Sequence, residues 1–281
     1  MTEDYSFRVY NTLSEKNNVN NDVNNYVNIK TFSYNKSKKD SRDHIYKTAN
    51  VSKVSNVSNV YSIDLRKLFS NIENQETIGS CTGNAIVGIL EYLNKKNKNI
   101  NIELSRLFIY YNERLLEGTV NYDAGAEIRS GIKACNIYGF CSEKLCPYDI
   151  KKFKIKPTEE SYLEASNHKA VSYQRILNFN DMKKALIDKN PVVIGFDVYS
   201  SFNKINKNGI MSYPGKYERY LGGHAVVIVG FNDNYLNKKG YFICRNSWGE
   251  KWGDKGYFYM PYEVIKNTNM SWDFWIITSI T

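Results

Sequence analysis

Residues 74–85 read Asn74-Gln75-Glu76-Thr77-Ile78-Gly79-Ser80-Cys81-Thr82-Gly83-Asn84-Ala85 and place a cysteine directly after a Gly-Ser turn. The apolar run of residues 85–93 follows and predicts a buried helix. A thiol at a helix N-terminus lies at the positive end of the helix dipole, beside backbone N–H groups that lack helical partners. Both features favour the thiolate, which is the nucleophilic form of cysteine. Cys81 is therefore a candidate nucleophile, and the Gln75 side-chain amide and the Cys81 N–H are candidate donors to an oxyanion.

Two later segments extend this pattern. They are Gly222-Gly223-His224-Ala225-Val226 and Arg245-Asn246-Ser247-Trp248-Gly249. Together with residues 74–85, and in the same order, they resemble the active-site segments of papain and the cathepsins. The resemblance extends from about Ser62 to the C-terminus, and the three segments taken together are very specific to that family.

The resemblance implies catalytic roles for Cys81, His224, Asn246 and Gln75. The Cys81 thiolate would form an ion pair with His224, attack the scissile carbonyl and give an acyl-enzyme. Asn246 would orient the imidazole, and Gln75 would stabilise the oxyanion. Trp248 resembles the tryptophan that shields the His–Asn contact from water. His224 is the only credible base, because the two other histidines lack its Gly-Gly-His-Ala context.

Two positions depart from the family pattern. Thr82 follows the candidate nucleophile, where the family usually has an aromatic residue. Ile78 stands where the family has a cysteine that normally forms a disulfide. Loss of that disulfide suits a reducing compartment. Neither change removes a group with a catalytic role.

The resemblance also suggests residues that bind substrate. Gly125-Ala126 is the nearest match, an incomplete one, to a Gly-Gly pair that binds the substrate backbone and edges the S2 pocket; a plain helix start would look similar. Gly223 predicts an open, uncharged wall beside His224. No histidine lies between Cys81 and Lys133, where cathepsin-B-like enzymes carry the histidines that bind a substrate C-terminus. We therefore expect an endopeptidase.

The order of the predicted elements indicates an α+β fold. Apolar residues at helical spacing predict helices over 104–116 and 127–134. Strands are predicted at 192–199, 225–229, 241–244, 257–260 and 274–277, which are β-branched or aromatic-rich. This order agrees with the papain-like fold that the resemblance implies. That fold has a helical left domain, about 61–150, and an antiparallel β-barrel right domain, about 151–281, with the active site in the cleft between them.

Residues 1–60 differ in character from the rest of the chain. They contain an Asn-rich run at 17–25 and a repeated Val-Ser-x unit at 51–60, and neither is apolar enough to fold alone. The segment is either a disordered tail or a prosegment. We favour a prosegment that lies in the cleft and covers Cys81, because papain-like enzymes are generally made with one. Cleavage would fall within residues 49–61, a polar linker by composition.

Charge and composition leave a second function open. The net charge of +9 favours acidic partners, so the alternative to an endopeptidase is a catalytically weak module that binds peptides, nucleotides or nucleic acid through a basic surface. No GxxxxGK[ST] motif supports nucleotide binding. No cofactor is implied, and no metal site is expected because Cys135, Cys141 and Cys146 are too widely spaced.

The sequence also bears on location. Residues 1–10 show no apolar signal-peptide region, and no apolar run is long enough to span a bilayer. We therefore expect a soluble, intracellular protein without a membrane partner, or one packaged in a virion or other particle made inside the cell.

Overall fold

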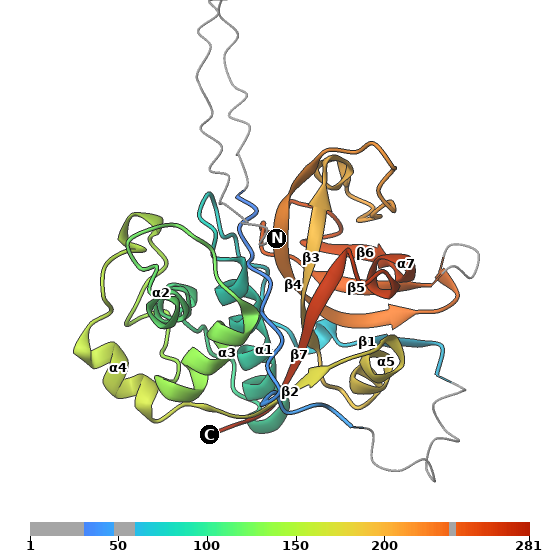
Figure 1. The fold of residues 1–281 in the computed structure, drawn as a ribbon. Coiled ribbons are helices and arrows are strands. Elements are labelled where there is room, and N and C mark those ends of the chain that lie inside the picture. The colour runs from blue at the N-terminus through green and yellow to red at the C-terminus, as the bar shows by residue number, and fades with distance from the viewer. Residues whose placement is uncertain (1–30, 48–59, 236–239) are drawn as a thin grey trace, which may run out of the picture.

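The computed structural model describes residues 31–47, 60–235 and 240–281. Helices gather in one half of the molecule and an antiparallel sheet forms the other half (Figure 1). The α+β arrangement expected from the sequence is therefore confirmed. The expectation for residues 1–30 and 48–59 lies outside the described residues.

The helical half is built around one long buried helix. Helix α1 (Cys81–Lys98) is buried from Cys81 through Asn94, and it ends where Asn99 adopts a left-handed conformation with φ of 55°. Its neighbours are α2 (Arg106–Glu117) and α3 (Ile128–Ile137). Helix α4 (Glu159–Ser166) lies on the same side of the molecule (Figure 1). Because α1 also packs on strands β4 and β7, it forms the contact between the two halves.

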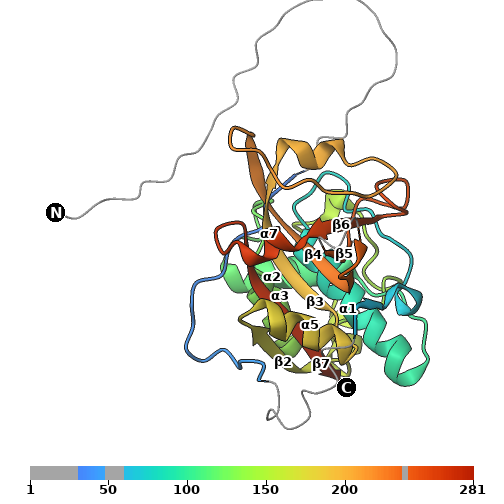
Figure 2. The same ribbon diagram turned by 90° about the vertical axis from the view of Figure 1, so that its right-hand side faces the viewer.

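The sheet half consists of antiparallel strands in the order β2-β7-β3-β4-β5-β6, with β1 paired to β4. The strands are β1 (Ser62–Asp64), β2 (Ala170–Ile176), β3 (Val192–Tyr199), β4 (Tyr220–Asn232), β5 (Tyr241–Arg245), β6 (Tyr257–Pro261) and β7 (Ser271–Ile280). Helices α5 (Phe179–Ile187) and α7 (Tyr262–Lys266) accompany this sheet (Figure 2). Short 3₁₀ turns span Arg66–Leu68, Ile150–Lys152 and Ser200–Lys204.

The sheet register brings distant residues together. Phe196 of β3 lies opposite His224 of β4, and Gly195 lies opposite Ala225. On the other side of β3, Gly195 pairs with Trp272 of β7. Residues that follow His224 in β4 and those near the start of β7 therefore flank the same stretch of β3.

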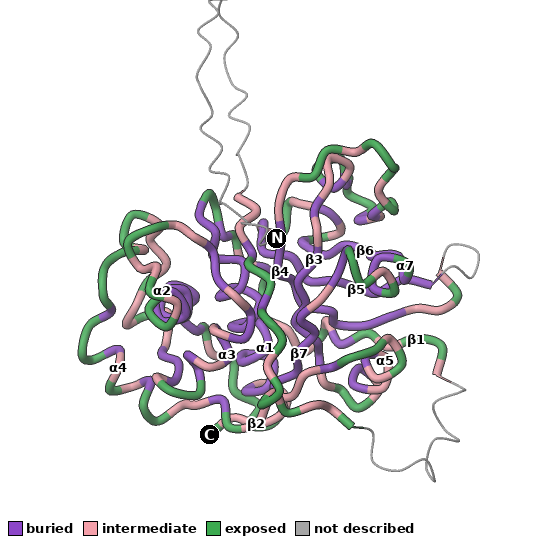
Figure 3. The backbone as a smooth tube through the Cα atoms, in the orientation of Figure 1, coloured by how far each residue is buried: buried purple, intermediate pink, exposed green. Residues whose placement is uncertain are grey.

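Most of the described chain shares one core. Buried apolar side chains of α1, α2 and α3 are continuous with those of strands β3, β4, β5 and β7. The tube in Figure 3 shows this buried material in the middle of the molecule and exposed residues toward the outer loops. The two halves are thus joined by packed side chains along α1.

Residues 31–47 run between the two halves. In Figure 1 this blue segment passes down the front, with α1 and α3 on one side and the sheet on the other. Isolated parallel bridges join Ser33 to Gly223, Asn35 to Glu127 and Ile45 to Arg175. The segment is therefore held by both halves.

The structure differs from the predicted elements mainly at their ends and edges. Strand β3 has the predicted bounds, whereas β4 and β7 extend several residues beyond the predicted runs. The sequence does not predict strand β2, because among the strands it pairs only with β7 at the edge of the sheet and most of it is partly exposed. An edge strand of this kind lacks the apolar run that marks a central strand.

Candidate active site

Cys81 is the first residue of α1 and is fully buried. The backbone N–H groups of Ala225 in β4 and of Thr82 in the first turn of α1 act on the thiol and lower its pKa. Burial is the larger effect, and it raises the pKa of Cys81 to about 12. In this covered arrangement the neutral thiol is therefore the favoured form at neutral pH.

His224 and Asn246 meet beneath Trp248. The imidazole Nε2 lies 2.8 Å from Asn246 Oδ1, and both residues are buried. The backbone N–H of Ser247 also donates to Asn246 Oδ1, at 2.9 Å, which orients the amide. The Trp248 ring centroid lies 5.3 Å from that of His224, with 31° between the planes. Because Asn246 engages Nε2, Nδ1 is the ring nitrogen on the opposite side of the imidazole from Asn246.

Gln75 is fully buried and held at both ends of its amide. Its Nε2 donates to the Ile78 carbonyl at 3.1 Å, and its Oε1 accepts from the Ser247 hydroxyl at 2.6 Å. Its backbone N–H donates to the Ser247 carbonyl at 2.8 Å. The amide nitrogen carries two hydrogens, so one stays available for an oxyanion.

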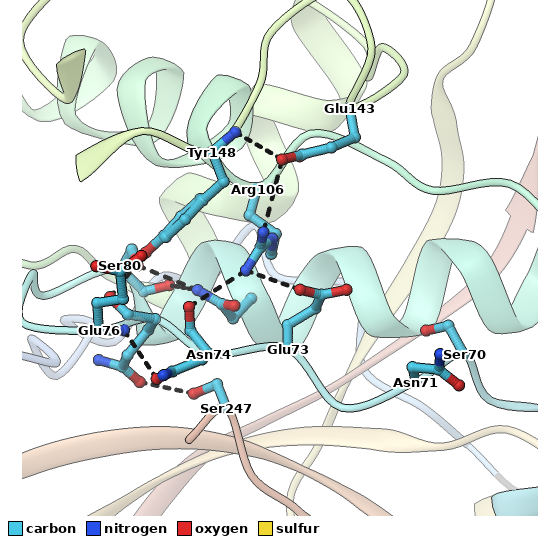
Figure 4. Close-up of polar contacts among 12 residues, drawn as sticks. Ser70, Asn71, Glu73, Asn74, Glu76, Ser80, Arg106, Glu143, Tyr148 and Ser247 are labelled. Carbon is cyan, nitrogen blue, oxygen red and sulfur yellow. Dashed lines mark hydrogen bonds and ion pairs between the residues drawn. The ribbon is translucent and has the colours of Figure 1, made fainter. Parts of the chain in front are cut away.

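A polar cluster supports the segment that carries Gln75 and Cys81 (Figure 4). The Tyr148 hydroxyl donates to the Gln75 carbonyl at 2.9 Å and lies 2.6 Å from the Ser80 hydroxyl. The Arg106 guanidinium lies 3.9 Å from the Tyr148 ring centroid and 3.0 Å from the Glu73 carboxylate. These contacts fix the backbone on both sides of the turn that precedes Cys81.

The residues expected to bind substrate surround residues 32–35. The backbone N–H of Tyr34 donates to the Gly223 carbonyl at 3.1 Å, and that of Asn35 donates to the Ala126 carbonyl at 3.1 Å. A Cβ at Gly125, whose φ is +67°, would lie 1.6 Å from the Ser33 carbonyl oxygen. Only glycine permits so close an approach.

Phe32 covers the histidine side of the site. Its ring centroid lies 6.0 Å from that of His224 and 5.6 Å from that of Trp248, both edge-on. One stretch of chain between the two halves thus contacts five of the expected residues, which are His224, Trp248, Gly223, Gly125 and Ala126. Asn246 is joined to this group through His224, and Cys81 through the N–H of Ala225.

Comparison with known proteins gives this arrangement a family. The profile of the papain family cysteine proteases matches residues 60–274. The chain belongs to the papain family. It is thus a cysteine-type peptidase, in agreement with the resemblance of its three segments.

Proteins similar to this papain-family peptidase come from a virus, a bacterium and a plant, among others. An uncharacterized peptidase C1-like protein of Acanthamoeba polyphaga mimivirus is 43% identical over 90% of this chain and 88% of its own length. The crystal structure of xylellain, a cysteine protease from Xylella fastidiosa, superposes with a TM-score of 0.79 at 35% identity, covering 89% of this chain and 96% of xylellain. The bromelain protease from Ananas comosus gives a TM-score of 0.58 at 25% identity, over 72% and 89% of the two chains.

The two departures from the papain pattern have local structural reasons. Ile78 packs in a small apolar cluster with Leu107 and Tyr110. The Thr82 hydroxyl donates to the fully buried carboxyl of Glu113, whose pKa is raised well above its usual range by burial. All five cysteines are free, and four of them are buried. Cys135, Cys141 and Cys244 belong to the main core, so they act as small apolar side chains.

Sequence reasoning missed one polar group beside the peptidase site. Asp273 of β7 has a fully buried carboxylate, which accepts from the hydroxyl of Tyr34 and lies 2.9 Å from the guanidinium of Arg175. No family segment marks it. The available signal was a single acid within the aromatic run Trp272-Asp273-Phe274-Trp275, since a carboxylate there is buried only when it has partners.

One further observation concerns membranes. Among the helices of the described residues, none combines the length and the apolar character that a bilayer span requires.

Proposed function

We propose that this chain is an endopeptidase in which Cys81 is the nucleophile, His224 the base and acid, Asn246 the residue that orients His224, and Gln75 an oxyanion donor. The observation that carries the proposal is the buried contact of 2.8 Å between His224 of β4 and Asn246, which follows β5. The residue after His224, Ala225, has the N–H that reaches the thiol at the start of α1. Nucleophile, base and orienting group therefore come from the two facing halves.

The reaction would proceed in two displacements. The Cys81 thiolate adds to the scissile carbonyl carbon, and the negative charge on the carbonyl oxygen is stabilised by the Gln75 amide and the Cys81 N–H. His224 gives its proton to the leaving amine, which leaves an acyl-enzyme on the sulfur. Water then adds to this thioester, loses its proton to His224 and releases the carboxylic acid and the thiolate.

We also propose that residues 1–60 form a prosegment that keeps the enzyme latent. The described part, residues 31–47, supports this: Phe32 lies edge-on to His224, Ser33 lies against Gly79 and Gly125, and Cys81 and His224 are both fully buried. Removing the segment would expose the thiol to water and to the imidazole, which would lower the Cys81 pKa and allow the ion pair with His224 to form. An intracellular setting stays a prediction of the sequence.

The test is self-processing and thiol labelling of the full-length chain. We expect wild-type protein to lose about 60 N-terminal residues over time, because the papain-like part of the chain begins at about Ser62. The shortened chain should then be labelled at Cys81 by an epoxide that alkylates active-site thiols. Cys81→Ala should do neither, whereas Cys135→Ala, which removes another fully buried thiol, should do both.

The pH dependence provides a second readout. Labelling of the intact chain should still rise between pH 6 and pH 9, because the pKa of the covered thiol is about 12. After the segment is released, labelling should be nearly independent of pH in that range. A chain that is neither labelled nor cleaves any peptide after release would contradict the catalytic proposal.

A further inference from the structure

Tyr34 places its side chain in a pocket of the sheet half. The residue is only 6% exposed, although it belongs to the segment that crosses the surface of both halves. Its ring lies against Gly195 of β3, where an added Cβ would be 2.2 Å from Cε1 of the ring. The pocket therefore exists because β3 has a glycine at this position.

The end of the pocket is a carboxylate. One oxygen of Asp273 accepts from the Tyr34 hydroxyl and, at 2.6 Å, from the backbone N–H of Ser37. The Asp273 side chain is fully buried, and its φ of 54° is unusual for a residue other than glycine. A buried acid in a strained conformation persists only where surrounding contacts hold it, and such positions cluster at functional sites.

The charges around Asp273 balance only when Asp43 of the segment is absent. Arg175 donates to the second oxygen of Asp273 at 2.9 Å and to Asp43 at 2.9 Å. Arg129 pairs with Asp43 at 2.6 Å and lies 3.9 Å from Glu127. When residues 31–47 leave, Asp43 leaves with them, and two cations and two carboxylates remain. A cationic substrate side chain would then find no carboxylate left to pair with it, whereas a neutral hydrogen-bond donor needs no counter-ion.

The pocket lies where a substrate side chain would bind. Its mouth is formed by Gly223 beside His224, and the next residue of the segment pairs with Ala126. Ser33, the neighbour of Tyr34, lies next to Gly79 and Gly125 at the approach to Cys81. Tyr34, whose side chain fills this pocket, is thus the direct chain neighbour of Ser33, which lies at the approach to the nucleophile.

We propose that Asp273 and Gly195 determine specificity, and that this peptidase prefers substrates with tyrosine two residues before the scissile bond. Gly195 gives room for the ring, and Asp273 accepts the phenol hydrogen. Phenylalanine would fit but leave the buried carboxylate oxygen without its donor, a loss that is large for a charged acceptor. The inference rests on the proposed function, since it assigns a substrate class to the same site.

The first test compares peptides that differ at one residue. After the full-length chain has released its N-terminal segment, we would measure kcat/KM for matched peptides with Tyr, Phe, Val or Arg two residues before the scissile bond. We expect Tyr to exceed Phe by about 10- to 100-fold, which is the worth of one hydrogen bond to a charged group. Arg should fall below Tyr. Equal values for Tyr and Phe, or Arg as the best substrate, would overturn the proposal.

Two variants assign the effect to residues. Asp273→Ala should bring the Tyr/Phe ratio to about one, because the acceptor is gone. Gly195→Ala keeps Asp273 and Arg175 in place, so it serves if the first variant does not fold. It should reduce cleavage of both aromatic peptides and spare the Val peptide, since only a ring reaches the added methyl group. An unchanged Tyr/Val ratio in this variant would contradict the assignment.

A second test needs no catalysis. In full-length chains that carry His224→Ala and so keep their segment, we would compare alkylation of Cys81 by iodoacetamide, located by mass spectrometry. Tyr34→Phe should speed alkylation about tenfold or more, because the segment loses its bond to Asp273. Tyr46→Phe is the matched control: its hydroxyl binds the exposed Asp188 at 3.1 Å, so its effect should be small.

The two tests separate the claims. Slow cleavage of every peptide together with a clear Tyr34→Phe effect would reject the proposed function and retain the pocket. Normal peptide cleavage with no Tyr34→Phe effect and no preference for tyrosine would retain the function and reject the inference.

Discussion

The two walls of the cleft hold residues 31–35 by different means, and the helical wall uses its backbone. Carbonyls of the helical half accept from Thr31 Oγ1, from the Asn35 side-chain amide and from the Asn35 backbone N–H; they belong to Thr77, Ala124 and Ala126. Gly125 adds close approach without a side chain. Contacts of this kind do not depend on the side chains of the bound peptide.

The sheet wall also offers the Gly223 carbonyl to the Tyr34 N–H, but it adds side chains. Asp273 accepts the Tyr34 hydroxyl, and the rings of His224 and Trp248 pack edge-on against Phe32. From this comparison we expect that the helical wall can bind almost any extended peptide, whereas the sheet wall, which carries the proposed base, selects among peptides. Substitutions on the two walls should therefore differ in their dependence on substrate sequence.

The largest effect should come from the base on the sheet wall. His224→Ala should lower kcat/KM more than about 1,000-fold for every peptide. The Cys81 thiol would then lack the base that accepts its proton, and the leaving amine would lack the acid that protonates it. His168→Ala, at a histidine stacked on Phe140, is the matched control and should leave kcat/KM unchanged. Comparable losses in both variants would show that His224 has no special role.

The helical wall should show its largest effect at Gln75. Gln75→Ala should lower kcat by about 100- to 1,000-fold, the usual loss for one oxyanion donor, with little change in the preference among peptides. Glu76→Ala next to it removes an exposed side chain and should change kcat little. A loss that varies strongly with peptide sequence would break the contrast between the two walls.

Side chains of both walls bind Asp43 of the segment. Its carboxylate, 6% exposed, pairs with Arg129 of α3 and with Arg175 of β2. Asp43→Ala should leave both cations without this partner and raise the rate of Cys81 alkylation in the intact chain by about 100-fold. Asp40→Ala removes a partner of the exposed Arg42 and should have a small effect. Equal rates for the two variants would indicate that the ion pairs do not hold the segment.

A smaller effect is expected from the glycine on the helical wall. Gly125→Ala should lower kcat/KM about tenfold for all peptides alike, because the methyl group meets any backbone that approaches as Ser33 does. Gly118→Ala is a close control, since Gly118 has a similar φ of +72° but nothing within 4 Å of the added Cβ. It should cost about 1 kcal/mol in the free energy of unfolding and leave kcat/KM unchanged.

Much of this arrangement could be predicted from the sequence because it is local. The segment before α1 and the Asn-Ser-Trp-Gly segment carry their own turn residues and apolar runs, and the central strand β3 was predicted with its observed bounds. Asp273 could not be assigned in this way. Its partners Tyr34 and Arg175 are distant in the chain and meet it only through the pairing of β7 with β2 and the path of the N-terminal segment.

The attachment of the covering segment to the sheet has a consequence for how much binding energy it needs. Strand β1 pairs with β4, so the chain is anchored at Ser62, shortly after residues 31–47. A tethered ligand experiences an effective concentration of about millimolar for a short flexible connection. The segment can therefore occupy the cleft with only moderate intrinsic affinity. In the proposed prosegment role, a single cut within residues 48–59 would abolish that local concentration, and simple dilution would then separate the segment from the rest of the chain.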